Sequence, residues 1–537
     1  MILFNLIKQF FFKNNHLYNN LIKYIVILFI LLLRQWEIFG KPYLWAEDGT
    51  LFINNVIEYG HKSLFFHGAG YYHFISFLFT NIFYFFCYII NNIVTLPYLM
   101  WTSSLLISGA AVFYFTSEEF KWILEKKRDR FIVCLLVILL IPAESSEVFG
   151  TITNIQWWLC FYFFLLGLNI CYKREMPGTC NIIILVLSAF STVGFLPLFG
   201  IFTLLLLDKI KRRAILKYDL LKYTALLIPS LIQIISIFFN RNNINSINPD
   251  GRVTKIINSY FNIMGKIIVP DFITFNNVSM IFIGILLLII ITAFSIKKNK
   301  ILLLFSLTYS LGFLLYCLLF TGQTTFVMSG DYFVNSRYII VSYMINAFLL
   351  SIIIVKYLFY IKTKPVIRVC ICVLLSLIVI VTIPFRFFIK MPISHYGDYT
   401  VYYKEFSNLY SKNGGKKIRI PLQNQDWHVT FPVNNFIITP NNNYEIMDNI
   451  TVSNDNMDIQ NNWIDVSVSL NDNYNKSDII SAMVLIEDIY YPMIKDNIIF
   501  SGMIPKSAIK HDESKIKIIF IKSNQVISIY EYDFINE

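Results

Sequence analysis

Residues 21–49 read LIKYIVILFILLLRQWEIFGKPYLWAEDG, an apolar run followed by two adjacent carboxylates, Glu47 and Asp48. A membrane-spanning helix needs about 20 predominantly apolar residues, and the segment 21–39 approaches that length. Adjacent acids disfavour each other's ionisation, or they bind a cation, a proton or a hydroxyl group. The stretch therefore predicts a retained membrane anchor with an acidic pair just beyond it.

The composition indicates a polytopic membrane protein. Of the 537 residues, 56% are hydrophobic and only 15% are charged, whereas a typical soluble protein has about 25% charged residues. The net charge of +11 does not indicate nucleic-acid binding, because the lysines and arginines lie mainly in short loops that orient helices in a membrane. All eight cysteines lie at or before Cys372, so the hydrophilic tail has no disulfide framework.

Eleven apolar segments indicate how the chain meets the membrane. They lie at 21–39, 71–90, 96–116, 131–142, 157–172, 181–207, 220–239, 278–296, 301–320, 338–360 and 368–388. Segment 181–207 is broken by Gly194 and Pro197, and cationic loops flank it on both sides. Because cationic loops stay in the cytoplasm, we expect two short helices that turn near residues 191–196.

The positive-inside rule then raises a conflict at the start of the chain. The loop 117–130 carries five lysines and arginines and should be cytoplasmic, like the lysine-containing N-terminus. Three apolar segments separate the two, but the number of crossings must be even. We expect segment 71–90, crowded with Tyr and Phe, to lie in the interface or dip into the membrane without crossing it. The acids then lie outside; if 71–90 crosses instead, they face the cytosol.

The expected fold is an α-helical polytopic membrane protein with about eleven crossings and a small extracytoplasmic domain at its C-terminus. Residues 1–388 would form the multi-pass domain, with an external loop at 41–95. Residues 389–537 would form the C-terminal domain. Heavy use of Asn, Ile and Lys is typical of AT-rich bacterial coding, so we expect a bacterial plasma (inner) membrane.

The C-terminal domain should contain β-strands. The period-two runs at 417–420 and 515–520 predict strands. The block 440–476 is very rich in Asn and Asp, and we expect it to be a loop.

Glu47 and Asp48 are the first candidates for catalysis. A carboxylate can deprotonate a hydroxyl group as a general base or bind a divalent cation, Mg²⁺ or Mn²⁺. The alternative is a structural role, because Asp is a common helix cap.

A second group of candidates could bind a sugar at the membrane exit. Glu147, Asn154 and Trp157 fall in one external stretch, where an aromatic face can stack on a sugar ring while carboxylate and amide groups bond its hydroxyls. His73, in the Gly-rich and His-rich stretch 67–73, is a further substrate-binding candidate. The alternative is an ordinary interfacial aromatic belt with polar caps. The spacing of the histidines fits no zinc motif.

Arg337 is the third candidate. It lies on the external side, against the positive-inside bias, and arginine suits bidentate recognition of phosphate. Tyr338 beside it is a substrate-binding candidate. Alternatively, Arg337 extends to lipid head groups or pairs with Asp331.

Several short patches give the chain a resemblance to the GT-C superfamily of polytopic glycosyltransferases, and to uncharacterised bacterial membrane proteins of that type. They are Leu44–Phe52 (LWAEDGTLF), Gly68–His73 (GAGYYH), Glu147–Trp158 (EVFGTITNIQWW), Ser336–Tyr338 (SRY) and Ile418–Trp427 (IRIPLQNQDW). The resemblance implies that Asp48, with Glu47 beside it, is the base or a metal-linked acid. It also implies that Arg337 contacts the phosphate of a polyprenyl-phosphate sugar donor.

The expected function is therefore an inverting transfer of sugar from a polyprenyl-phosphate donor to a surface glycan, such as an O-antigen, or to a lipid-linked acceptor. A flippase or transporter is the main alternative, but the apolar segments carry almost no charges in their cores, where substrate and ion pathways usually have them. A polymerase or ligase of surface polysaccharide is a second alternative.

Overall fold

The computed structural model describes most helices and strands of the chain. The described residues are 15–36, 44, 47–68, 71–142, 148–192, 194, 196–212, 217–239, 252–269, 277–295, 300–320, 339–359, 383–387, 416–421, 428–433, 450–451, 463–469, 479–486, 489–496, 499–505, 515–522 and 525–533.

The chain forms two compact units. We call the first the helical unit; it comprises Met1–Gly40, Phe65–Ser76 and Thr102–Pro392. The second, the sheet unit, comprises Lys41–Leu64, Phe77–Trp101 and Ile393–Glu537. The sheet unit thus joins two segments from the first 101 residues with the C-terminal part of the chain.

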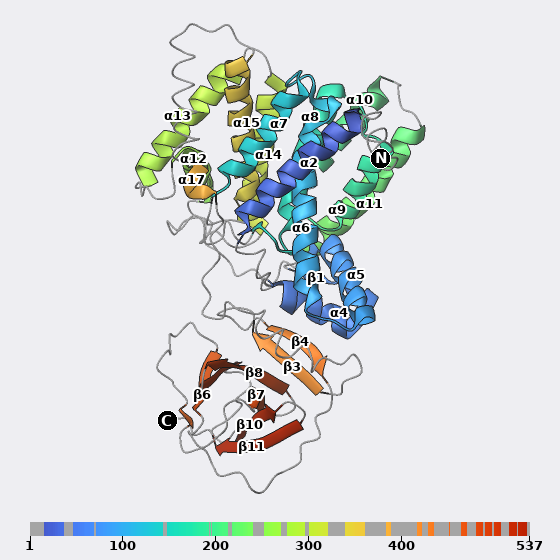
Figure 1. Cartoon of the computed structure of the whole chain (residues 1–537). Coiled ribbons are helices and arrows are strands. Elements are labelled where there is room, and N and C mark those ends of the chain that lie inside the picture. Colours follow the sequence, from blue (N-terminus) through green and yellow to red (C-terminus); the bar gives the residue numbers. More distant parts are fainter. Residues whose placement is uncertain are drawn as a thin grey trace, which may run out of the picture. The chain divides into compact units, whose positions relative to one another are not determined.

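The helical unit contains most of the helices (Figure 1). Its elements are α2 (Asn15–Arg34), β1 (His67–Gly68), β2 (Tyr71–Tyr72), the start of α5 (Phe74–Ile90), most of α6 (Thr95–Phe113), η3 (Tyr114–Thr116), η4 (Glu118–Phe120), α7 (Lys127–Leu140), α8 (Ile155–Lys173), α9 (Thr179–Ala189), α10 (Leu196–Lys211), α11 (Lys217–Phe239), α12 (Arg252–Lys266), α13 (Asn277–Ser295), α14 (Lys300–Phe320), α15 (Ile340–Phe359) and α17 (Ile383–Arg386).

Helix α8 forms the core of the helical unit. Every residue from Ile155 to Ile170 is buried, as expected for a helix that is apolar around its whole circumference. The ring of Phe164 lies 5.8 Å from that of Phe305 on α14 and 5.6 Å from that of Phe348 on α15. Helices α14 and α15 therefore both pack against the middle of α8.

Three described helices are long and apolar enough to cross a membrane: Thr95–Thr116, Ile155–Lys173 and Tyr218–Phe239. Shorter apolar helices lie at Phe74–Ile90, Thr179–Ala189, Val278–Thr292, Lys300–Leu314 and Ile340–Lys356. The described part of the chain thus has the character of a membrane protein, by helix length and composition, while the count of about eleven crossings stays a prediction.

The expected break in segment 181–207 is confirmed, because α9 ends at Ala189 and α10 begins at Leu196. The stretch between the apolar segments 220–239 and 278–296 contains helix α12. This helix packs closely on α13, because a Cβ added at Gly284 would clash with the carbonyl oxygen of Phe261.

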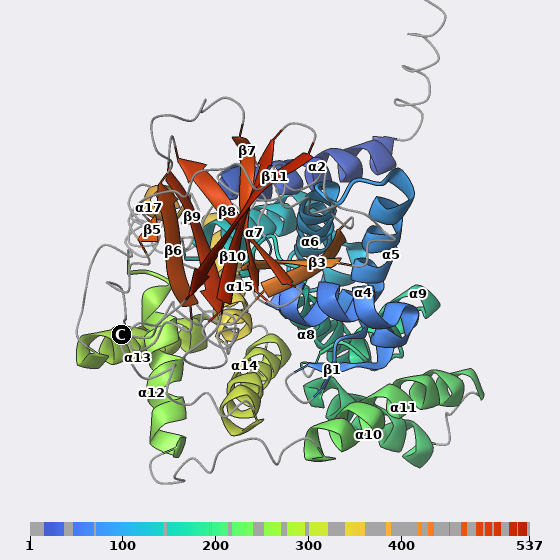
Figure 2. The same ribbon diagram turned by 90° about the horizontal axis from the view of Figure 1, so that it is seen from below.

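The sheet unit combines a twisted sheet with short helices (Figure 2). Its elements are η1 (Asp48–Ile53), α4 (Asn54–Tyr59), η2 (Gly60–Phe65), the rest of α5, the start of α6, β3 (Lys416–Pro421), β4 (His428–Val433), β5 (Ile450–Thr451), β6 (Trp463–Ser469), β7 (Ile479–Ile486), β8 (Ile489–Asp496), β9 (Ile499–Pro505), β10 (Lys515–Lys522) and β11 (Gln525–Asp533). The main strand order is β11-β10-β7-β8-β9-β6-β5, and β3 pairs with both β8 and β4.

The central strands of this sheet are apolar. Residues 482–486 of β7 are all buried, and they pair with β8 in an antiparallel register. Strands β3 and β10 confirm the predicted strands at 417–420 and 515–520. The loop expected over 440–476 is wrong for β6, which alternates apolar and polar residues and pairs with β9 along its whole length.

Candidate functional site

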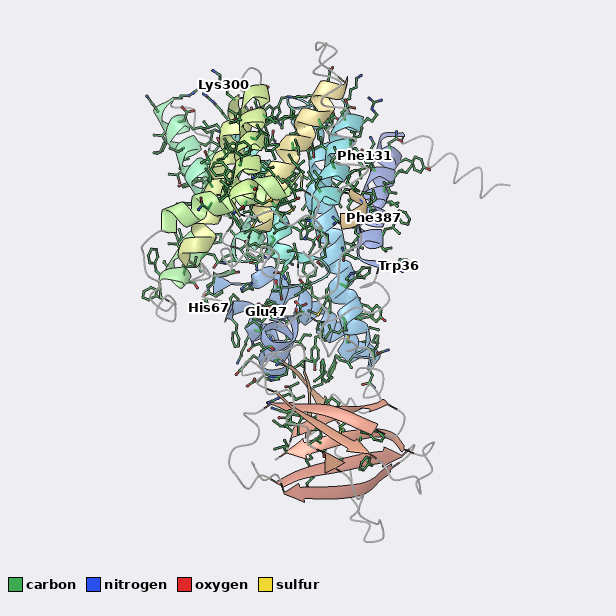
Figure 3. All side chains as sticks on the ribbon, turned by 90° about the vertical axis from the view of Figure 1, so that its left-hand side faces the viewer. Trp36, Glu47, His67, Phe131, Lys300 and Phe387 are labelled. Atoms are coloured by element: carbon green, nitrogen blue, oxygen red, sulfur yellow. The ribbon has the colours of Figure 1, made fainter. Side chains whose placement is uncertain are left out.

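The two acids lie at the start of an unusual helical turn in the sheet unit. Asp48 is the first residue of the π-helical turn η1, and Glu47 occupies the position before it (Figure 3 labels Glu47). Asp48 is only 1% exposed and Glu47 is half-buried. π-helical turns are rare and occur frequently at functional sites.

The helix-cap alternative does not fit this geometry. Asp48 lies inside the turn rather than at its cap, and the Glu47 side chain makes no capping hydrogen bond to the turn. Neither position is that of a capping carboxylate, and carboxylates can also accept a proton or bind a cation.

Apolar packing fixes one side of η1. Phe52 and Ile53 are fully buried, and the ring of Phe52 meets the ring of Phe77 on α5 edge to face at 4.9 Å. On the same helix, Asn81 donates a hydrogen bond from Nδ2 to Ser63 Oγ in η2 at 3.0 Å. The turn with the acids is thus packed against α5.

Four hydrogen bonds attach the other side of this turn to strand β4. Thr50 Oγ1 donates to the carbonyl of His428 at 3.0 Å and accepts from the His428 amide at 2.9 Å. Asn54 Nδ2 donates to the same carbonyl at 3.0 Å, and the Thr430 amide donates to Asn54 Oδ1 at 2.7 Å. We call this contact the β4 clasp.

The β4 clasp completes the edge of the sheet. Among the described strands, β4 pairs only with β3, so its second edge would otherwise present unpaired amides and carbonyls. Thr50 and Asn54 are four residues apart and so lie on one helix face, where they can bond to that edge together. The clasp holds the acids and the C-terminal sheet in one structural unit.

A second polar cluster lies in the helical unit, around the hairpin of β1 and β2. His73 is 4% exposed, and its Nε2 lies 3.0 Å from the carbonyl oxygen of Gly68. The hydroxyl of Tyr71 donates to Oε1 of Gln156 on α8 at 2.9 Å. Gln233 of α11 bonds both the amide and the carbonyl of Tyr72, at 3.0 and 3.1 Å.

Asn154 and Trp157 are part of the same region at the N-terminus of α8. The indole Nε1 of Trp157 donates to Asn154 Oδ1 at 2.8 Å, and Asn154 Nδ2 donates to Thr151 Oγ1 at 3.0 Å. Asn154 is fully buried and Trp157 is 2% exposed. Asn154 and Trp157 thus bond to each other, while Gln156 between them bonds to Tyr71 of the hairpin.

The structure thus brings together His73, Asn154 and Trp157 in one unit, and Glu47 and Asp48 in the other. Glu147, Arg337 and Tyr338 lie outside the described residues. Of the described His, Cys, Asp and Glu side chains, no three gather as a potential metal site.

Sequence reasoning missed the role of Arg34. Arg34, at the end of α2, is fully buried and donates from Nε to the Phe387 carbonyl at 3.1 Å. Its two other nitrogens donate to the carbonyls of Ile138 and Ile141 at the C-terminus of α7. A cation is favourable at a helix C-terminus. The sequence did contain a signal for this role, because Arg34 lies inside the first apolar run.

Sequence reasoning also missed the clasp residues Thr50 and Asn54, which directly follow the acids at helical spacing.

No protein-family model matches this chain, and no curated protein or solved structure matches it either.

Proposed function

We propose that this protein is a bacterial membrane glycosyltransferase of the GT-C type, which transfers a sugar from a polyprenyl-phosphate donor on the extracytoplasmic face. The observation that carries the proposal is the buried Asp48 in a π-helical turn that the β4 clasp ties to the C-terminal sheet. A rigidly held carboxylate beside a polar domain suits a base that meets an acceptor glycan.

The clasp also bears on the topology. Segments Lys41–Leu64 and Ile393–Glu537 belong to one unit, so they lie on the same side of the membrane and an even number of crossings separates them. Counting 181–207 as two helices, the predicted segments after the first give ten crossings if 71–90 does not cross and eleven if it does. This parity supports a segment 71–90 that does not cross, and with it the external location of the acids and the C-terminal domain.

The chemistry follows from the residue types. Asp48 would accept the proton of the acceptor hydroxyl, whose oxygen attacks the anomeric carbon as the bond to the donor phosphate breaks. Arg337 would hold the departing polyprenyl phosphate and stabilise its charge. Glu47 would orient the acceptor or, with Asp48, bind Mg²⁺ or Mn²⁺.

The remaining candidates would bind the sugars. We assign this role to His73, Glu147, Asn154, Trp157 and Tyr338, with the C-terminal domain selecting the acceptor. Because Asn154 and Trp157 bond to each other, a sugar would have to displace that hydrogen bond to reach these polar atoms.

The test compares Asp48→Asn with the full-length wild type in membranes. Transfer of radiolabelled sugar would be measured with a panel of polyprenyl-phosphate-linked hexoses. General-base catalysis typically contributes at least about 100-fold, so Asp48→Asn should lower transfer by that factor. Glu58→Gln is the matched control, because Glu58 is an exposed acid on the next helix, α4.

The outcomes separate the candidate functions. Loss of transfer in Asp48→Asn with normal expression, and none in Glu58→Gln, supports the base. Full transfer by Asp48→Asn refutes the role of Asp48. If the wild type transfers no sugar but moves lipid-linked glycan across the membrane, the protein is a flippase and the proposal fails.

A further inference from the structure

The helical unit contains an apolar cavity away from the acids and the hairpin cluster. It measures about 730 Å³ and lies between α2, α6, α8 and α9. Its wall includes Leu21, Ala111, Leu159 and Ile184. The volume falls in the range of about 300–1,000 Å³ that is usual for small-molecule sites.

The polar groups in the wall bond to one another. Tyr162 donates to Asn181 Oδ1 at 3.1 Å, and Asn181 Nδ2 donates to the Tyr114 hydroxyl at 3.4 Å. That hydroxyl donates in turn to Glu119 at 2.8 Å, and Asn169 also donates to Glu119. Because these groups are satisfied internally, the cavity suits a hydrocarbon chain better than a polar ligand.

The edge of the cavity is apolar and accessible. Leu21 is 48% exposed and Ile184 is 41% exposed, and both line the cavity. These exposed apolar side chains leave a route by which a hydrocarbon chain could enter the cavity.

Two lysines lie beside one end of the cavity. Lys127 donates a hydrogen bond to Oδ1 of Asn20, a lining residue, and lies close enough to Lys23 for repulsion between the two charges. Neither lysine forms an ion pair with a described residue. The acids nearby already have partners: Glu118 pairs with Lys121 and Arg130, and Asp129 pairs with Arg128.

We propose that this cavity binds the hydrocarbon chain of a membrane lipid whose phosphate is held by Lys23 and Lys127. Glu118 attracts Lys127 but forms its ion pairs with Lys121 and Arg130. Two neighbouring ammonium groups that form no ion pair with a described residue complement an anionic head group, while the apolar walls complement its chain. The phosphate could belong to a glycerophospholipid or to a polyprenyl phosphate. The site is separate from the proposed catalytic acids.

The test uses full-length protein in vesicles that contain phosphatidylglycerol with a photoreactive group in its acyl chain. Crosslinked peptides would be identified by mass spectrometry. We expect labelling of α2, α6 and α9 near Leu21, Ala111 and Ile184. Adding unlabelled polyprenyl phosphate or unlabelled phosphatidylglycerol in excess then distinguishes the two sources of the phosphate.

Two variants test the two halves of the site. Ala110→Phe fills the exposed edge of the cavity and should abolish this labelling. The double variant Lys23→Gln, Lys127→Gln should lower it about 25-fold, at about fivefold for each lysine. Lys173→Gln, an exposed lysine at the end of α8, is the matched control and should leave labelling unchanged.

Absence of labelling in the cavity peptides of the wild type would overturn the proposal. Equal labelling by a photoreactive phosphatidylcholine, unchanged by the double lysine variant, would overturn the recognition of phosphate.

Discussion

Removing Asn54 from the β4 clasp should loosen the edge of the C-terminal sheet by a measurable amount. The Asn54 amide makes two hydrogen bonds, to the His428 carbonyl at 3.0 Å and from the Thr430 amide at 2.7 Å. At about 1 kcal/mol of net stabilisation each, Asn54→Ala should lower the local opening free energy by about 2 kcal/mol. That corresponds to about 30-fold faster amide hydrogen exchange in residues 428–430.

Hydrogen exchange measured by mass spectrometry on the full-length protein can resolve this effect. Asn55→Ala is the matched control, because the Asn55 side chain donates to the Leu51 carbonyl in η1 at 2.5 Å and to no described residue of β4. Thr50→Val gives a second variant of similar shape and should speed exchange at His428, whose amide donates to Thr50.

Unchanged exchange at residues 428–430 in Asn54→Ala would refute the clasp. An equal increase in Asn54→Ala and Asn55→Ala would also refute it, since the effect would then reflect a general loss of stability in α4. In either case the clasp would no longer support placing the acids and the C-terminal sheet on the same side of the membrane.

Two further predictions concern the helical unit. Gly284→Ala should lower the thermal unfolding midpoint in detergent, at a cost of about 1–3 kcal/mol, because the new methyl group meets the Phe261 backbone. The control Gly312→Ala has open space at its Cβ and should be neutral or stabilise the protein by up to about 1 kcal/mol. Equal midpoints for the two variants would contradict the close crossing of α12 and α13. The hydrogen bond from Lys121, together with the nearby Arg130 charge, lowers the pKa of Glu118 below its ordinary value. The stability from this group is therefore fully present above that ordinary pKa and is lost as the pH falls through the lowered one. Glu118→Gln should flatten the acid side of the stability profile, by a small amount because the side chain is half exposed, and an unchanged profile would count against the interaction.

Local sequence patterns correctly predicted those helix ends and strands that depend on only a few neighbouring residues. Gly194 and Pro197 predicted the break between α9 and α10, and the alternation of apolar and polar residues predicted β3 and β10. The loop predicted over 440–476 was wrong for β6, because the prediction rested on the many Asn and Asp residues of this block and overlooked the short alternating run of β6.

The candidate site was harder to predict, because its contacts join residues far apart in the chain. Asp48 and Glu47 stood out as adjacent charges, but nothing near Asn54 indicates that it bonds to Thr430. The aromatic pattern of Trp157 indicated a membrane interface, whereas the surrounding helices bury it and leave its indole bonded to Asn154.

The β4 clasp has a consequence for biosynthesis. Asn54 and His428 are separated by 374 positions, so the turn that carries the acids leaves the ribosome long before the strand to which it bonds. Long-range contacts of this kind form late. A nascent chain that stops before residue 428 would already have made most of its helices but could not close the clasp. The acidic turn can therefore form all the hydrogen bonds of the clasp only after residues 428–430 have been synthesised.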